Sequence, residues 1–191
     1  PDFLVTPPQR ISLDYAKARE KGRDDILRNL SGVAVAGDFL WTAADEGRSV
    51  ECLEPDGHGG YRGHMQYRLD DIFPKLPNPP DEADIESLAV TTAKDRTMTL
   101  WICGSHCLVR RQSKKEREQE KAHKPRRIRS HIDPRQSRHL LGRVTLTNEG
   151  GALDKKSGAA LPFANRGALC QRLGRDDFLA PFMDLPSKEN G

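Results

Sequence analysis

Residues 31–47 read SGVAVAGDFLWTAADEG, and residues 86–106 read ESLAVTTAKDRTMTLWICGSH. Both stretches contain a run of small β-prone residues, a turn, a second run that includes a tryptophan, and a polar turn. Trp41 and Trp101 are 60 positions apart and the two strand starts are 55 apart, so the second copy has the longer hairpin loop. The sequence therefore predicts one antiparallel hairpin unit that occurs twice.

Each unit has candidates for further strands. In the first unit, residues 49–53 and 61–69 are β-prone and flank a loop rich in turn formers, EPDGHGG. In the second unit, the clearest outer strand is LLGRVTL at 140–146. A four-stranded antiparallel unit that recurs about every 50 residues is typical of a β-propeller blade. The predicted fold is therefore all-β, with β-propeller-like four-stranded antiparallel blades.

The chain divides into three segments on this interpretation. Residues 1–80 hold an N-terminal strand and the first blade, and residues 81–149 hold the second blade with a basic insert at 110–138. Residues 150–191 are expected to form a helical excursion of one or two short helices, because their apolar residues recur at roughly helical intervals. Since propellers close with about four to eight blades, residues 1–191 are expected to form a partial propeller of about two to three blades.

Composition and charge exclude some classes of protein. The chain has 191 residues, 36% hydrophobic and 31% charged, and its apolar runs are too short to cross a bilayer, so a membrane protein is excluded. Residues 110–129 hold ten Lys or Arg against three Glu, a density that can neutralise phosphates. The same segment has no aromatic residue to stack on bases, which favours a solvated insert over a nucleic-acid site.

Cysteines and most histidines are interpreted conservatively. The four cysteines are too few for a disulfide scaffold and are read as reduced thiols, which favours a cytoplasmic location. His58 and His64 lie in or beside the glycine-rich loop, where a solvated tip is expected. His123, His131 and His139 belong to the basic insert and are expected at the surface.

The ordered motifs carry a family resemblance. The succession LSGVAV, LWTAADEG, DDIFP, DIESLAV, LWICGSH, HLLGRVTL and PSKENG resembles the bacterial β-propeller family known as domain of unknown function 3616, from about Leu30 to the last residue. The resemblance implies that the chain corresponds to the N-terminal half of such a propeller, with the C-terminal half as its partner. It also implies similarity to propellers that include calcium-dependent phytase-like and esterase-like enzymes. The family pattern D-x-E-G is Asp84-Ile85-Glu86-Ser87 here, so the glycine that would ease a close backbone approach is absent.

Polar residues are expected to converge at one mouth of the propeller channel. In antiparallel neighbours, one strand begins where the other ends. Asp84 and Glu86 precede the inner strand of the second unit, His106 follows its second strand, and Asp45 and Glu46 follow the matching strand of the first unit. These four carboxylates are candidate Ca²⁺ ligands, and Glu86 and His106 are candidate catalytic groups. The alternative is that the carboxylates only hydrogen-bond to neighbouring turns.

Three functions follow from these features. The first is an uncharacterised propeller scaffold that binds a small molecule or protein at the channel mouth, with a divalent cation. The alternative is a calcium-dependent phytase-like or other phosphoester hydrolase, in which the cation polarises the phosphoryl group. The third, nucleic-acid binding through Arg110 to Arg129, ranks lowest. The sequence leaves open whether the protein is an enzyme.

Overall fold

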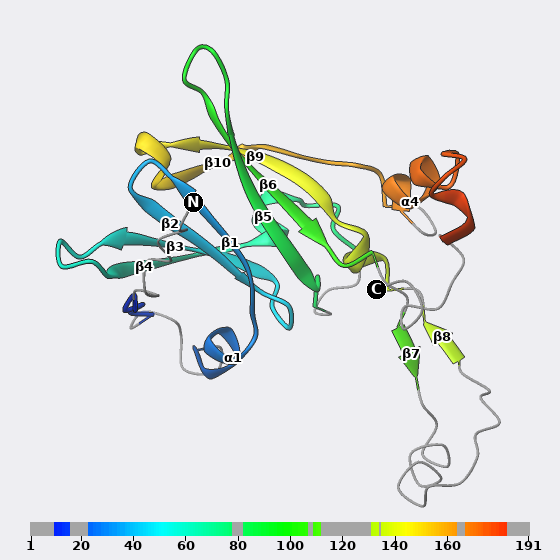
Figure 1. The fold of residues 1–191 in the computed structure, drawn as a ribbon, viewed down its shortest axis with the longest axis horizontal. Helices are drawn as coiled ribbons and strands as arrows, with labels where there is room; N and C mark the ends of the chain where they lie inside the picture. Colours follow the sequence, from blue (N-terminus) through cyan, green and yellow to red (C-terminus); the bar gives the residue numbers. More distant parts are fainter. Residues whose placement is uncertain are drawn as a thin grey trace, which may run out of the picture.

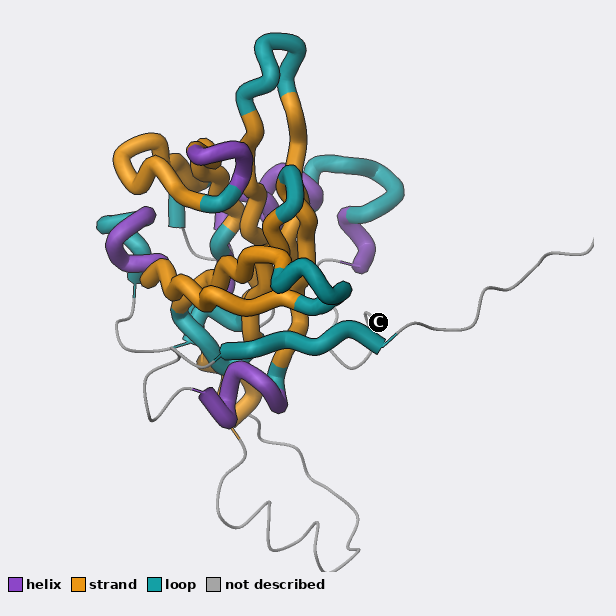
Figure 2. Tube along the Cα trace, turned by 90° about the vertical axis from the view of Figure 1, so that its left-hand side faces the viewer, coloured by secondary structure: helices purple, strands orange, loops and turns teal. Residues whose placement is uncertain are grey.

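The computed structural model consists of two four-stranded antiparallel sheets with a few short helices, which confirms the all-β prediction (Figure 1). It describes residues 10–15, 23–77, 82–106, 109–111, 131–133, 135–163 and 167–182. The strands gather in the middle of the molecule and the short helices lie around them (Figure 2).

The first sheet is a continuous meander. Its strands are β1 (Leu30–Ala36), β2 (Phe39–Ala44), β3 (Ser49–Pro55) and β4 (Tyr61–Arg68), hydrogen-bonded in that order. The β1–β2 turn contains Gly37 with φ of 57°, a left-handed conformation that glycine adopts without steric cost. The two outer strands lie where the alternation of β-prone residues predicted them. Helix α2 (Leu69–Ile72) follows β4, and its Leu69 and Ile72 are buried.

The second sheet repeats the construction of the first. Its strand order is β10-β9-β6-β5, formed by β5 (Ile85–Thr92), β6 (Met98–Gly104), β9 (Leu141–Thr147) and β10 (Ala152–Ala160). The registers match, because Ala34 pairs with Trp41 in the first hairpin and Ala89 pairs with Trp101 in the second. The predicted duplication of one hairpin unit is therefore visible in the pairing itself.

Strand β10 differs from the expected helical excursion at 150–191. Its sequence, ALDKKSGAA, lacks a strict alternation, and its pairing with β9 shifts register between Asp154 and Ala159. The pairing with β9, and not a local pattern, therefore holds this segment extended. Helix α4 (Gly167–Leu173) and the 3₁₀ helix η3 (Ala180–Phe182) lie farther along, within the segment where short helices were expected.

The basic insert leaves the second sheet between β6 and β9. Strands β7 (Val109–Arg111) and β8 (His131–Asp133) pair with each other, and the 3₁₀ helix η1 (Gln136–His139) leads into β9. Residues 112–130, which carry most of the basic charge and His123, lie outside the described residues.

One hydrophobic core fills the space between the two sheets. The first sheet contributes Trp41 and Cys52, which are fully buried, and the second contributes Leu100 and Val144 from its facing side. The 3₁₀ helix η2 (Asn148–Gly150) of the second sheet meets the first, where the Trp41 indole Nε1 donates a hydrogen bond of 2.8 Å to a main-chain oxygen. Since cores of this kind supply most of the folding free energy, the two sheets stabilise each other.

The other face of the first sheet is partly covered by N-terminal residues. The Asp14 main-chain N–H donates to the carbonyl of Tyr61, at 2.8 Å, and the Tyr61 N–H donates to the carbonyl of Ser12, also at 2.8 Å. Together with helix α1 (Arg23–Arg28), this segment places Tyr15 and Ile26 over Leu53 in a second, smaller hydrophobic cluster. Among the described residues, no helix is long and apolar enough to cross a membrane.

Candidate functional site

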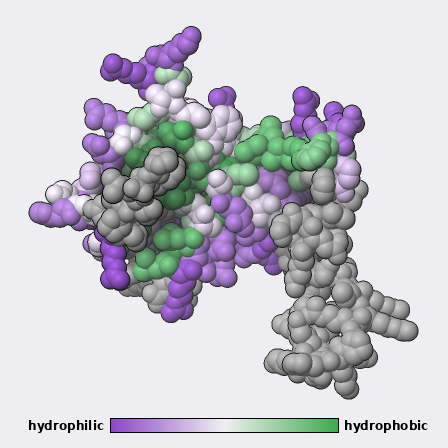
Figure 3. Space-filling view, in the orientation of Figure 1, coloured by the Kyte–Doolittle hydropathy of each residue, from purple (hydrophilic) through white to green (hydrophobic). Residues whose placement is uncertain are grey.

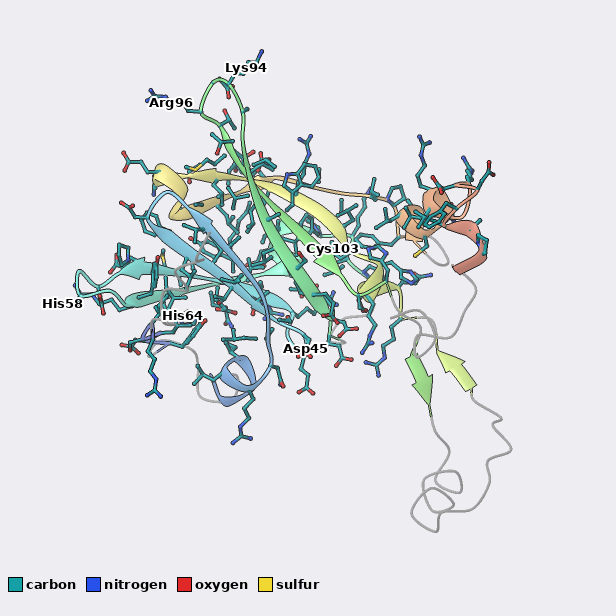
Figure 4. All side chains as sticks on the ribbon, in the orientation of Figure 1. Asp45, His58, His64, Lys94, Arg96 and Cys103 are labelled. Atoms are coloured by element: carbon teal, nitrogen blue, oxygen red, sulfur yellow. The ribbon has the colours of Figure 1, made fainter. Side chains whose placement is uncertain are left out.

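The ends of three strands converge at one edge of the molecule. Ile85, which begins β5, pairs with Gly104, which ends β6, and the Ser105 N–H donates to the Asp84 carbonyl at 2.8 Å. The two sheets meet there, because the Ala83 N–H donates to the carbonyl of Gly47 at 3.1 Å. Asp45 lies at this edge, and Lys94 and Arg96 lie at the opposite end of the second sheet (Figure 4).

Two of the predicted ligand carboxylates act electrostatically on a third, Glu86. The pKa of Glu86 is raised, first by its partial removal from water and then by the negative charges of Asp84 and Asp45, while Arg138 acts in the opposite direction. Asp84 and Glu86 come from the start of β5, whereas Asp45 follows β2 of the other sheet. The structure therefore brings carboxylates from both sheets into one electrostatic neighbourhood.

Cationic and amide groups balance part of this charge. Arg138 forms an ion pair of 2.6 Å with Asp84 and a second ion pair with Glu82, which also contacts Arg135. On the other side, Glu46 accepts a hydrogen bond of 2.9 Å from the Asn29 side-chain amide. Asp84 and Glu46 thus each have a side-chain partner within the protein.

Asp45 also stabilises its own turn. Its Oδ1 accepts a hydrogen bond of 2.7 Å from the main-chain N–H of Glu46. Within the described residues, no three Asp, Glu, His or Cys side chains are grouped closely enough to hold a metal ion. A cation at this edge would therefore need the carboxylates to move toward it or a ligand to supply further oxygen atoms.

His106 lies beside this edge but contacts a different group of side chains. Its Nδ1 lies 3.7 Å from Sγ of Cys170 on α4, and its ring stacks on His139 with centroids 5.8 Å apart. Burial lowers the pKa of His106, and the neighbouring His139 lowers it further. The two residues predicted as catalytic therefore belong to adjacent clusters, Glu86 with the carboxylates and His106 with a thiol and a second imidazole.

The cysteine environment is consistent with reduced thiols. Cys52, Cys103 and Cys170 are free thiols. Burial raises the pKa of Cys52 to about 12, with a further contribution from Glu54. Burial also raises the pKa of Cys103, and the nearby Cys170 and Glu86 add to the shift. Higher pKa values keep these groups protonated at neutral pH, where a thiol is a poor nucleophile.

Two of the expectations for histidine are wrong. His64 was expected at a solvated tip and is buried, because β4 turns it toward Glu51 of β3 and Tyr15 of the N-terminal segment. His139 was expected at the surface of the insert and is buried, because η1 packs it against His106. His58, at the tip of the β3–β4 loop, is exposed as predicted (Figure 4).

The buried pair of Glu51 and His64 belongs to a polar network that the motifs did not reveal. Nε2 of His64 lies 2.5 Å from Oε2 of Glu51, and the His64 ring packs edge-on against Tyr15, with centroids 5.2 Å apart. The Tyr15 hydroxyl lies 2.8 Å from Oγ1 of Thr42, and burial raises the pKa of Tyr15. A signal was present in β3, where Glu51 stands between two apolar residues of a strand that is buried on both faces.

Comparison with known proteins gives one match. The family model described as "Protein of unknown function (DUF3616)" matches residues 29–191. The comparisons with curated proteins and with solved structures found no match.

Proposed function

The chain belongs to the DUF3616 family of proteins of unknown function, and we propose that it is part of a β-propeller-type scaffold that binds a ligand at its strand-end edge with the help of a divalent cation. The proposed site is formed by Asp45, Glu46, Asp84 and Glu86. The ligand is a small molecule or a protein segment that supplies the remaining oxygen ligands of the cation.

The stacking of the two sheets supports the propeller part of the proposal. Both sheets have the same strand order from inner to outer strand, and the side of the first sheet that carries Trp41 packs on the opposite side of the second. The inner strands β1 and β5 lie side by side, and the Ser31 hydroxyl on β1 donates to the carbonyl of Ile85 on β5. Repetition of this step around an axis is how propeller blades are arranged.

The grouping of carboxylates from both sheets is the observation that supports cation binding. Partial loss of water contact raises the pKa of Glu86, and the negative charges of Asp84 and Asp45 raise it further, so an added positive charge would favour its ionised form. Carboxylate oxygens are the ligands that Ca²⁺ prefers. Arg138, paired with Asp84, adds a cationic group at the same edge that suits an anionic part of a ligand.

A hydrolase is supported less well than a binding scaffold. A general acid or base must reach the group that it protonates, within about 3 Å or through one water molecule. Nδ1 of His106, the candidate for this role, faces Cys170, and its Nε2 is buried, so neither ring nitrogen is open to a ligand at the edge. Phosphoester hydrolysis therefore stays the second candidate function and nucleic-acid binding the third.

Calorimetric titration with CaCl₂ tests the proposal. The protein should bind Ca²⁺, and Glu86→Gln and Asp84→Asn should each weaken the binding at least tenfold. Asp38→Asn is the matched control, because Asp38 lies in the exposed β1–β2 turn and its loss removes the same charge. Absence of binding heat, or equal affinity in all four proteins, would exclude the cation site.

A further inference from the structure

Among the described residues, each end of the two-sheet stack has an exposed face. On the first sheet, we call the side of strand β1 that faces away from the core the head face. It contains Val33 and Val35, which are 64% and 56% exposed. We call the outward side of the second sheet the tail face; it contains Ser87 and Ala89 of β5 and the half-buried Trp101. Hydrophobic surface is visible among hydrophilic residues on the side of the molecule drawn in Figure 3.

The repeat shows what each face contacts when it is covered. With the offset of 55 positions, Val33 corresponds to Leu88 and Val35 to Val90, and these two second-sheet residues pack in the core against the first sheet. The open head face thus matches the part of the second sheet that is already covered. In the same way, the tail face matches the side of the first sheet that carries Trp41.

The side chains on the two open faces are also complementary in size. Inside the molecule, Leu88 packs closely over Gly32, since a Cβ at Gly32 would lie 3.1 Å from Cγ of Leu88. At the equivalent positions of the open faces, Gly32 is replaced by Ser87 and Leu88 by Val33. Ser87 is larger than Gly32, but Val33 is shorter than Leu88. The two changes offset each other, so strands β5 and β1 of two copies can approach as closely as β1 and β5 do within one copy.

From this complementarity we propose that the tail face of one copy of the chain docks on the head face of a second copy, continuing the stacking of the sheets from one molecule into the next. The contact is heterologous, because the tail face of one copy meets the head face of the next. Association therefore proceeds to a ring or a chain of copies. Tyr15 and Ile26 cover the outer half of the first sheet, so on the head face the contact is confined to the inner strand β1. A contact limited to one strand of the head face is a small interface, which predicts reversible association at high protein concentration.

The inference rests on the sheet stacking used in the proposed function and not on the cation. Association is therefore measured in EDTA, where the cation site cannot contribute, by sedimentation velocity over a concentration series. Failure of Ca²⁺ binding leaves this result unaffected, and absence of association leaves the calorimetric result unaffected.

Two variants and their mixture test the head-to-tail geometry. Val35→Glu blocks the head face and Ala89→Arg blocks the tail face, and both positions are exposed, so circular dichroism and the melting temperature should be unchanged. Each variant alone should sediment as a monomer. An equimolar mixture should form a one-to-one dimer and nothing larger, because the intact tail of the first variant meets the intact head of the second.

Three outcomes would overturn the proposal. They are a wild-type monomer up to the solubility limit, self-association of either variant alone, which indicates a symmetric contact, and a mixture that stays monomeric. Phe178→Glu is the control, because it introduces a charge at a residue that is 78% exposed and lies outside both faces. This control should associate like the wild type.

Discussion

Glu86 is a carboxylate whose ionised form is less favourable in the folded protein than in the unfolded chain. Its pKa is raised by partial loss of water contact and by the charges of Asp84 and Asp45. For such a group, the cost to stability is present above the folded-state pKa and is relieved as the pH falls through that pKa. The ionised form of Glu86 therefore lowers the stability of the folded protein at neutral pH.

Glu86→Gln should accordingly stabilise the protein at pH 7. Because the side chain is largely exposed, the gain is at most about 0.5 kcal/mol after solvent screening. Thermal unfolding in EDTA at pH 7 and at pH 4 measures it, and the gain should shrink at the lower pH. Asp38→Asn should show no such pattern, and a Glu86→Gln protein that melts earlier than wild type at pH 7 would contradict the expectation.

The pair of Glu51 and His64 is the most deeply buried polar contact at the first sheet, with both side chains 1% exposed. Glu51→Leu leaves Nε2 of His64 without its acceptor, and a buried polar group of this kind costs about 1–3 kcal/mol. Urea denaturation should show this loss, and adding His64→Leu should recover part of it. Gln66→Ala, on an exposed residue of β4 that also contacts Glu51, should change stability by less than about 0.5 kcal/mol.

The β1–β2 turn of the first sheet packs against η2 beside the second sheet. A Cβ at Gly37 would clash with the carbonyl oxygen of Glu149 in η2, and Gly37 also has a positive φ. Gly57 in the β3–β4 loop shares the positive φ of 79° and has open space around it. The two glycines therefore separate the cost of the backbone conformation from the cost of the clash.

Gly37→Ala should destabilise the protein more than Gly57→Ala. The backbone conformation alone costs roughly 1–2 kcal/mol in each variant. Chemical denaturation of both variants measures the difference, which reports the packing of the turn on the second sheet. Equal losses would mean that η2 moves aside without cost.

The strands differed in how readily the sequence predicts them. The β1–β2 and β5–β6 hairpins were predicted because turn residues and β-prone runs alternate locally, and both exist. Strand β10 was not predicted, because its polar residues carry no alternation and only the pairing with β9 keeps it extended. Long-range pairing of this kind leaves no trace in a short window of sequence.

The candidate site was predictable in its placement and not in its contacts. Convergence of Asp45, Asp84 and His106 at one edge follows from the antiparallel order of the strands, which the repeat reveals. The engagement of Asp84 by Arg138 and of His106 by Cys170 depends on η1 and α4, which come from distant parts of the chain. Burial of His64 likewise depends on the N-terminal segment and not on the loop beside it.

Because one core holds both sheets, the molecule should unfold as a single unit. Trp41 is fully buried between the sheets, whereas Trp101 is half-buried and its Nε1 donates to Oγ1 of Thr91 in its own sheet. Trp41→Phe removes ring volume and the hydrogen bond to the second sheet, with an expected loss of about 2–4 kcal/mol. Trp101→Phe should cost less than about 1 kcal/mol.

Denaturation followed by far-ultraviolet circular dichroism and by fluorescence measures both losses at a protein concentration low enough to avoid association. The curves from the two probes should coincide in each variant. Two separate transitions would show that the sheets fold independently, and equal losses in the two variants would contradict the larger cost expected at Trp41.

Strands β7 and β8 pair with each other, so the insert leaves the sheet and returns to it at neighbouring points. This pairing holds the two ends of the insert together whatever sequence lies between them. The entropy cost of closing a loop grows only logarithmically, by about 0.6 kcal/mol for each doubling of its length. The number of residues between Arg111 and His131 can therefore vary widely among related sequences without disturbing the sheet. This position in the fold can acquire new sequence, and with it new binding partners, at little expense to stability.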